Sequence, residues 1–266
     1  MYGGHAVTQS KPDGADRPIT LTHFRATDDS TLVKSFSIGS DGAIRKTSHA
    51  QFSLGVAWKT TLESGLVSLP QFIDDLEPTD CLATGVFDKQ KVRVIPQGKS
   101  IESDDSRPVR HRTKEAMRQP EPGLALLDHD HSPCMPDTLR CATPTELMHR
   151  ITKAIPAFKE VGWVGRGSSS QGILNEKTGE SYAATAGIHV YIAANTSDLD
   201  ALKRDLEVAL WRAGLGYVEF ARNGRRLLRT IIDLSVLSPE RLIFEAAPTL
   251  GPGVGRVAPS WERFDG

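Results

Sequence analysis

The sequence predicts an α/β or α+β fold, a sheet with helices packed on one face. Two observations predict it: in the second half of the chain strand-like and helical apolar spacings alternate, and their order is strand, helix, strand, helix, strand, strand. Such an order is typical of a sheet covered by helices. The strand candidates are residues 124–130, 187–193, 217–220, 229–236 and 242–245.

The helices carry their own start and stop signals. Residues 143–146 (TPTE) supply an N-cap, a proline in the first turn and a capping-box acid. The helix that opens at Ser197-Asp198 has leucines at helical spacing and Gly214 as its stop. In the N-terminal half, we expect a strand over residues 32–38 and a short helix after Leu69-Pro70.

Polar segments rich in glycine and proline divide the chain. Residues 1–20 are expected to form a flexible arm, and residues 251–266 a linker or tail. Residues 97–122 form a third polar stretch with several cations. A solvated loop is the first interpretation of that stretch, and a surface facing a bound polyanion is the alternative.

Composition limits the class of protein. With 266 residues, of which 39% are hydrophobic and 24% charged, the chain can bury a sizeable core. The formal net charge of −1 does not indicate a polyanion partner for the molecule as a whole. Three cysteines fit a reducing compartment. No apolar run approaches the roughly 20 residues of a membrane span, so we expect a cytoplasmic protein without membrane contact.

Three aspartates are the candidate metal ligands. The apolar run 124–127 ends in Asp128 and Asp130, which in a strand share a face about 6–7 Å apart. Their repulsion would be removed by a divalent cation. A second apolar stretch, 229–233, ends in Asp233, so the three carboxylates predict a site for Mg²⁺ or Mn²⁺. Alternation turns His129 to the opposite face and excludes it.

His189 and a serine-rich segment are the other candidates. His189 shares a strand face with Tyr191, opposite an apolar face that helices would cover, and is either a structural residue or a ligand. Residues 165–172 are either a flexible loop or a phosphate cradle in which small side chains let backbone amides approach oxyanions. The polar side chains of this segment are those of Arg166, Ser168, Ser169, Ser170 and Gln171.

A structural zinc site is an alternative use of five nearby residues, His129, His131, Cys134, Cys141 and His149. The two cysteines lack the C-x2–4-C spacing, so unpaired cysteines are the preferred interpretation.

In order, the motifs are an apolar DxD, a serine-containing loop leading to GIHVYI, and an apolar stretch ending in Asp233. They resemble the hhhDxD, SxH and hD motifs of the archaeo-eukaryotic primase superfamily. The stretches RTKEAMRQPEPGLALLDHD, GWVGRGSSSQGI, GIHVYIAA, RTIIDLSVLSPERLIFEAAP and HFRATDDSTLVKSFSI look like primase-polymerase domains of bacterial mobile-element, plasmid and phage replication proteins. The resemblance covers roughly residues 22–250. The polar segment 175–186 departs from it as a candidate hairpin insertion, which leaves open which serine matches the motif.

The resemblance implies a two-lobed fold for residues 21–250. An N-terminal α/β lobe over about 21–120 would pack on a catalytic lobe over about 121–250, built on an RRM-like sheet with one open face and the active site in the cleft. The implied activity is that of a DNA primase-polymerase, a template-dependent nucleotidyl transferase. Its partners would be single-stranded DNA template or primer, NTP or dNTP, and a helicase domain or another replication protein.

The resemblance also implies roles for single residues. Asp128, Asp130 and Asp233 would hold two Mg²⁺ or Mn²⁺ ions beside His189. The incoming triphosphate would be held by His189, Arg166 and the loop serines, with Arg229 as a further phosphate contact. Arg222, Arg225 and Arg226 would face template or product backbone, or solvent, and both alternatives stay open.

Two other function classes compete with the polymerase. One is a replication-initiator module that binds DNA or nucleotide with little or no catalysis, and the other is a metal-dependent phosphoesterase or nuclease. Three convergent carboxylates favour an enzyme over a binding module, because acids near phosphate weaken binding. A nuclease would leave the serine loop and the GIHVYI strand without a role.

Overall fold

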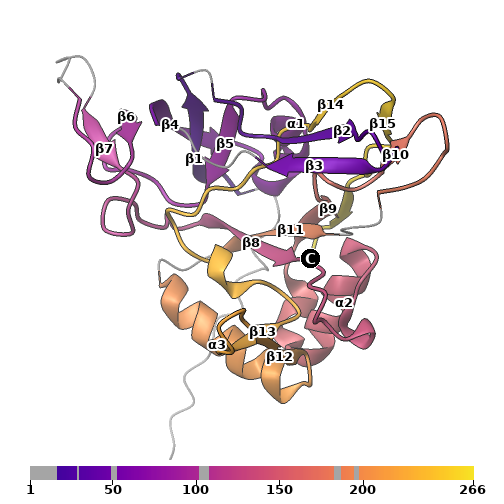
Figure 1. Cartoon of the computed structure of the whole chain (residues 1–266). Coiled ribbons are helices and arrows are strands. Elements are labelled where there is room, and N and C mark those ends of the chain that lie inside the picture. The colour runs from indigo at the N-terminus through magenta and orange to yellow at the C-terminus, as the bar shows by residue number, and fades with distance from the viewer. Residues whose placement is uncertain (1–16, 29, 49–52, 102–107, 183–186, 195–197) are drawn as a thin grey trace, which may run out of the picture.

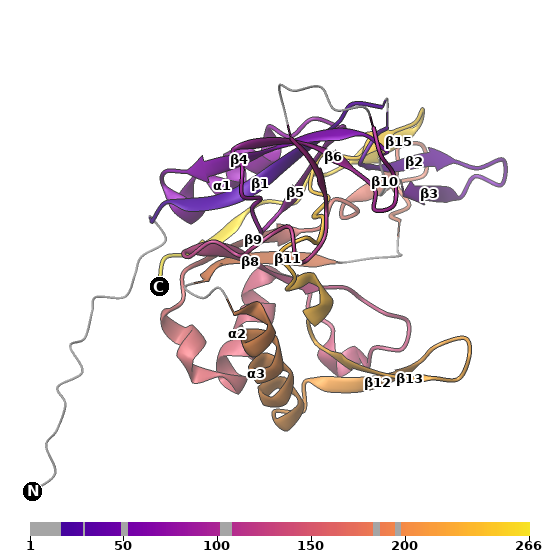
Figure 2. The same ribbon diagram turned by 90° about the vertical axis from the view of Figure 1, so that its left-hand side faces the viewer.

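The fold of this chain is mixed α/β with strands predominating. The structure, a computed structural model, describes residues 17–266 except 29, 49–52, 102–107, 183–186 and 195–197. Figure 2 shows three layers: an N-terminal sheet, a central sheet, and a layer of helices below it. Among the described residues, no helix is long and apolar enough to cross a membrane.

The N-terminal layer is a five-stranded sheet in the order β5-β1-β4-β6-β7. A short 3-10 helix, η1 (Gly65–Val67), and α1 (Leu69–Asp74) connect β4 to β5, and α1 has the expected proline in its first turn. The strands are β1 (Ile19–Ala26), β4 (Gly55–Leu62), β5 (Asp80–Ala83), β6 (Lys91–Ile95) and β7 (Val109–His111).

The central layer is a four-stranded antiparallel sheet in the order β16-β9-β11-β8. Its register places His189 opposite Asp128 on one side and opposite Arg166 on the other. The strands are β8 (Gly123–His129), β9 (Trp163–Gly167), β11 (Ile188–Ala194) and β16 (Glu262–Phe264).

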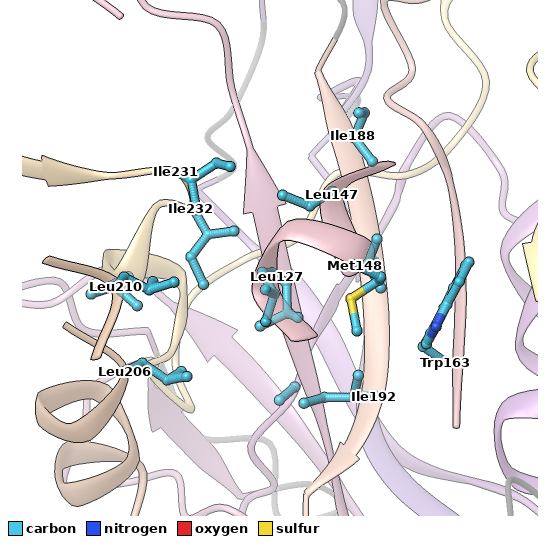
Figure 3. Close-up of a cluster of buried hydrophobic side chains, with 14 of the residues drawn as sticks. Leu127, Leu147, Met148, Trp163, Ile188, Ile192, Leu206, Leu210, Ile231 and Ile232 are labelled. Carbon is cyan, nitrogen blue, oxygen red and sulfur yellow. The ribbon is translucent and has the colours of Figure 1, made fainter. Parts of the chain in front are cut away.

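Both helices cover the same face of the central sheet, as the sequence predicts. They are α2 (Pro144–Ala154) and α3 (Leu199–Arg212), and their apolar residues pack on Leu127, Val190 and Ile192 (Figure 3). Thr143 caps α2 by accepting a hydrogen bond from the Glu146 amide, and Asp198 caps α3. Short 3-10 helices flank α2: η2 (Asp137–Leu139) and η3 (Pro156–Glu160).

The opposite face of the central sheet is not open, which corrects the expectation from strand alternation. Leu124, Leu126, Val164 and Tyr191 on this face share one apolar core with Leu21 and other residues of the N-terminal layer. Tyr191 is fully buried. At the edge of this face, where β8 and β11 reach Asp128 and His189, the side chains of these two residues are 14% and 11% exposed, respectively.

The stretch 229–236, expected as one strand, divides into three parts. β13 (Arg226–Thr230) pairs with β12 (Gly216–Phe220) in a separate hairpin, residues 231–233 run beside β8, and η4 (Leu234–Val236) follows. The stretch 242–245 is not a strand either, because only Ile243 forms an isolated bridge, with Leu82. The β12–β13 hairpin extends from the helical layer (Figure 2).

The C-terminal residues are part of the fold, not the linker that their composition predicts. β14 (Thr249–Leu250) pairs with β2 (Lys34–Ile38), which pairs in turn with β3 (Ile44–Ser48). β15 (Val254–Arg256) pairs with β10 (Ile173–Asn175), and β16 extends the central sheet. At the other end, β1 already begins at Ile19, while residues 1–16 of the expected arm lie outside the described residues.

Candidate active site

Asp128 and Asp130 lie at the end of β8, at the edge of the central sheet. β8 runs beside β11 in the middle of the molecule (Figure 1), and Asp128 pairs in register with His189. Asp130 follows the strand, and its Oδ1 is close to the loop before β11, since a Cβ on Gly187 would lie 2.8 Å from it. The strand end thus brings both aspartates beside the residues that precede and begin β11.

His129 points to the opposite side, as strand alternation predicts. Its Nδ1 bonds the Ile231 carbonyl oxygen and its Nε2 accepts a hydrogen bond of 3.0 Å from the Cys141 amide. Burial lowers the pKa of His129 to about 4, so the ring is neutral and structural. Cys134 is exposed while Cys141 is buried, and among the described residues no three His, Cys, Asp or Glu side chains are grouped to hold a metal ion. The alternative zinc site therefore has no support.

Asp233 reaches the same edge without being part of a strand. Its amide donates a hydrogen bond of 2.7 Å to the Asp128 carbonyl oxygen, which fixes residues 231–233 beside β8. Its carboxylate accepts from the amide and the hydroxyl of Ser235, each at 2.9 Å, and so caps η4. The structure brings the three predicted carboxylates to one place, with that of Asp233 engaged locally.

The surroundings of Asp128 raise the pKa of its carboxyl group. Burial, and the negative charges of Asp130, Asp233 and Glu245, raise its pKa to about 6, against the opposing effect of His189. Asp128 Oδ1 is buried without a hydrogen-bond partner among the described residues, and lies 3.5 Å from His189 Nε2. An ionised carboxylate in this position is short of positive charge, which is a frequent property of functional sites.

A buried carboxylate that the sequence analysis did not single out, Glu245, holds His189. Its side chain is fully buried and accepts hydrogen bonds from His189 Nδ1 and from the Tyr191 hydroxyl. Burial alone would lower the pKa of His189, but the charge and hydrogen bond of Glu245, with the charge of Asp128, raise it to about 9. His189 is therefore a cation at neutral pH, with Nδ1–H on Glu245 and Nε2–H toward Asp128.

Arg166 also belongs to the Glu245 cluster. It lies in β9, not in a loop, and its guanidinium donates to the Glu245 carboxylate at 3.0 Å and to Asp74 at 2.7 Å. Trp261 stacks on this guanidinium at 4.5 Å and bonds the same Asp74. Two carboxylates neutralise Arg166 and its side chain is 8% exposed, so Arg166 is not free for the expected role in holding a triphosphate.

Two of the loop serines and two of the three aspartates line one cavity of about 610 Å³, which Asp128 does not line. Ser168 and Ser170 line it together with Asp130 and Asp233, whereas Ser169 is buried away from the lining. The Ser168 hydroxyl lies beside Asp130, since a Cβ on Gly187 would be 3.0 Å from its oxygen. Of the three serines, Ser168 is the one best placed to contact a molecule bound beside Asp130.

Two lysines from the N-terminal half also line this cavity, and the sequence analysis did not find them. Lys34 and Lys46 project from the β2–β3 hairpin on one side of its strands. Burial, and the neighbouring charge of Lys46, lower the pKa of Lys34, while Asp130, Glu245 and Asp128 act in the opposite direction. Neither ammonium group has an ion-pair partner among the described residues. Both are available to an anionic ligand.

The β12–β13 hairpin forms another wall of the cavity. Arg229 lines it but is paired with Glu219 at 3.0 Å, and Tyr217 lies directly opposite Arg229 in the register. The arginines at the tip of the hairpin are exposed: Arg222, Arg225 and Arg226. Arg229 is thus less available to phosphate than its position in the sequence indicates.

The segment that departs from the primase motif is a hairpin. The Tyr182 amide bonds the Ile173 carbonyl oxygen, and the Asn175 amide bonds that of Glu180, each at 2.8 Å. Phe36 packs edge-on against Tyr182 at 5.4 Å. This hairpin is anchored on β2 and β15, and residues 183–186 of the segment lie outside the described residues.

A second hollow, of about 760 Å³, lies where the 114–121 segment meets the start of α3. The Lys114–Asp200 ion pair at 2.6 Å occupies its wall. Three acids also line it, but Asp198 caps α3 and Asp200 pairs with Lys114, which leaves Glu121, whereas lysines that are unpaired among the described residues face the acids in the hollow at the end of β8. The hollow at the end of β8 is therefore the candidate active site.

Comparisons of the chain with protein-family models, with curated proteins and with solved structures found no match in any of the three.

The donor chemistry at this edge fits a divalent cation. Carboxylate oxygens are the ligands that Mg²⁺ and Mn²⁺ prefer, and Asp128 has a buried oxygen without a hydrogen-bond partner among the described residues. The three carboxylates are not yet grouped as ligands, because that of Asp233 bonds Ser235. Binding of a cation by all three would require Asp233 to turn away from Ser235.

Proposed function

We propose that the chain is a template-dependent nucleotidyl transferase, a DNA primase or polymerase that uses a single-stranded template and nucleoside triphosphates. One observation carries the proposal: acids at the end of β8 and cations from the N-terminal hairpin line the same cavity. Asp130 and Asp233 contribute the acids, and Lys34 and Lys46 the cations. Such a mixture suits a polyanionic substrate that is bound by cations and held near a metal.

The topology supports a primase-like arrangement. The catalytic half runs β8, α2, β9, β11, α3, and its three main strands pair antiparallel in the order β9-β11-β8. Residues 231–233 lie against the free edge of β8, through the amide of Asp233. This is the order of an RRM-like sheet in which an irregular segment stands in for the last strand. The N-terminal layer covers the face that carries His189 and Tyr191.

The three motif aspartates would hold the metal. When bound by Asp128, Asp130 and Asp233, Mg²⁺ or Mn²⁺ supplies positive charge that favours loss of the proton from the attacking 3′-hydroxyl and stabilises the leaving pyrophosphate. Asp128 is suited to this task because its buried oxygen has no hydrogen-bond partner among the described residues. The free energy that its ionisation costs in the absence of a cation is regained when a cation binds.

The phosphates would be bound by His189 together with two lysines that have no ion-pair partner among the described residues. His189 is a cation that Glu245 fixes in orientation, and its Nε2–H points toward Asp128. Lys34 and Lys46 would neutralise the triphosphate, and the Ser168 hydroxyl would donate to one of its oxygens. We thus assign to the two lysines the contact that the sequence analysis expected from Arg166.

Primer extension tests this proposal. Primed and unprimed single-stranded templates are incubated with NTPs or dNTPs and either Mg²⁺ or Mn²⁺. The wild type is expected to extend or initiate chains, and Asp128→Ala/Asp130→Ala to reduce synthesis by at least about 10³-fold. The matched control, Asp137→Ala/Asp205→Ala, removes two exposed acids and should leave synthesis unchanged. Synthesis that survives the first double substitution would overturn the proposal.

The lysine assignment has its own readout. Lys34→Met keeps the length of the side chain and removes its charge, so we expect a higher KM for the nucleotide with a smaller change in kcat. Lys91→Met, on an exposed residue of β6, is the control. An unchanged KM for nucleotide in Lys34→Met would exclude Lys34 from triphosphate binding.

A second candidate is a replication-initiator module that binds nucleotide or DNA with weak or no catalysis. The observation that favours it is the Asp233 carboxylate, which caps η4 through Ser235 and is not turned toward Asp128. The two functions differ in the same assay: a wild-type protein that binds template and nucleotide but forms no product with either metal would favour the binding module.

A further inference from the structure

The β12–β13 hairpin exposes large apolar side chains on the face opposite Tyr217 and Glu219. Val218, Phe220 and Leu228 are 41%, 63% and 63% exposed, respectively. The register pairs Val218 with Leu228 and Phe220 with Arg226, so all four lie on one face of the two strands. Large apolar side chains gathered on an exposed surface mark an interaction site.

The charge of the hairpin restricts what it can bind. Residues 216–230 contain four arginines and a single acid, Glu219, which is paired with Arg229. The remaining three, Arg222, Arg225 and Arg226, are exposed near the tip, where Arg226 pairs in register with Phe220. A surface of exposed arginines beside an aromatic ring is complementary to a polyanion whose bases can stack.

The hairpin is also shaped to present this surface. Its tip is a tight turn in which the Ala221 amide bonds the Arg225 carbonyl oxygen at 2.9 Å. Gly224 adopts a positive φ of 76° at this turn, a conformation that glycine takes without strain. The hairpin extends from the helical layer, clear of both sheets (Figure 2). Its other face carries Tyr217 into the cavity, and Leu228 reaches the rim.

We propose that the exposed face of the β12–β13 hairpin binds single-stranded nucleic acid, with a base stacked on Phe220 and the flanking phosphates on Arg222, Arg225 and Arg226. A strand held there would pass along the wall of the cavity that contains Asp130 and Asp233. The inference rests on the proposed function in one respect only: it identifies this strand as the template or primer of the same site.

Equilibrium binding without catalysis tests the hairpin. The full chain is titrated into fluorescein-labelled (dT)20 in EDTA, with anisotropy as the readout. Phe220→Ala is expected to weaken binding about 5- to 100-fold, the effect of losing one stacked base. The control, Phe264→Ala, removes an aromatic ring that is 42% exposed on β16, outside the hairpin, and should change affinity less than twofold.

Salt dependence separates the arginines from the ring. A triple variant, Arg222→Gln/Arg225→Gln/Arg226→Gln, should reduce the slope of log affinity against log salt by about 2, since each phosphate contact on a single strand contributes about 0.7. The control triple removes three exposed arginines elsewhere and should leave the slope unchanged: Arg204→Gln/Arg212→Gln/Arg241→Gln.

The outcomes distinguish this inference from the proposed function. If the wild type binds (dT)20 but Phe220→Ala and the hairpin triple variant bind as tightly, the hairpin proposal is overturned while the polymerase proposal stands. If the wild type binds no single strand, the hairpin proposal is overturned, while primer extension with Mg²⁺ or Mn²⁺ still decides the polymerase proposal. If Phe220→Ala changes the sedimentation of the protein alone and not its affinity for DNA, the surface is a contact between two copies, which also overturns the proposal.

Discussion

Replacing Glu245 by glutamine tests whether an ion pair fixes His189 at the site. The substitution keeps the size of the side chain and removes its charge, while His189, Tyr191 and Arg166 remain as buried donors. The pKa of His189, raised to about 9 against an ordinary value of about 6.5, corresponds to about 3 kcal/mol of stabilisation. The pKa of Glu245, lowered to about 2, reports the same interaction from the other partner, so the two values are not added.

The sign of the pH dependence follows from these directions. Because folding raises the pKa of His189, its contribution is complete below about pH 6.5 and is lost as the pH rises through about 9. Because folding lowers the pKa of Glu245, its contribution is present above about pH 4.3 and is lost as the pH falls toward 2. The pair therefore stabilises the protein most between about pH 4.5 and 6.5.

The assay is denaturant unfolding of the wild type and of Glu245→Gln at pH 6 and pH 10. We expect the variant to be less stable by at least about 3 kcal/mol at pH 6, with about that amount recovered at pH 10, where His189 is neutral in both proteins. Glu63→Gln, on an exposed residue, is the control and should change little at either pH. In NMR titration, the midpoint of His189 should fall from about 9 to below 6.5 in the variant. An equal loss of stability at both pH values, or an unchanged midpoint, would refute this account of His189.

Two further predictions concern stability. Asp128→Asn should stabilise the protein by about 1–3 kcal/mol at pH 8 in EDTA, and not at pH 4. Folding raises the pKa of Asp128 to about 6, so the wild type loses stability as the pH rises from about 4 to 6. A destabilised variant in denaturant unfolding at pH 8 would contradict this. Truncation after Leu250 removes β15, β16 and Trp261, which stacks on Arg166. It should lower the Tm in calorimetry by at least about 6 °C. An unchanged Tm would mean that residues 251–266 do not stabilise the fold.

The elements that the sequence predicted well are those specified by neighbouring residues. The cap at Thr143 with Glu146 and the glycine stop at Gly214 act within one helical turn, and α2 and α3 form where these signals place them. The strand β11 was readable because its apolar alternation is local. The tail was misread because its short strands gain their stability from distant partners: Glu262 pairs with Gly165, and Val254 with Asn175.

The same distinction separates the predicted from the missed site residues. Asp128, Asp130, His189 and Asp233 stand at the ends or on one face of apolar stretches, a pattern that could be read and that resembles a known motif set. Lys34 meets them only because the β2–β3 hairpin folds over the cavity, and its local sequence gives no sign of that contact. For Glu245 there was a weak signal, an acid within the apolar stretch LIFEAA. A carboxylate there must be paired if it is buried.

The two carboxylates that flank His189 have pKa values shifted in opposite directions. Glu245 is fully buried yet its pKa is lowered, because His189, Arg166 and Tyr191 all donate to it or attract it. Asp128, whose side chain is 14% exposed, instead has a raised pKa, because burial disfavours its charged form and the nearby acids add to that effect, while His189 acts against it. If the proposed metal binds beside Asp128, the carboxylate whose ionisation weakens the protein without metal is the one that the cation would stabilise most.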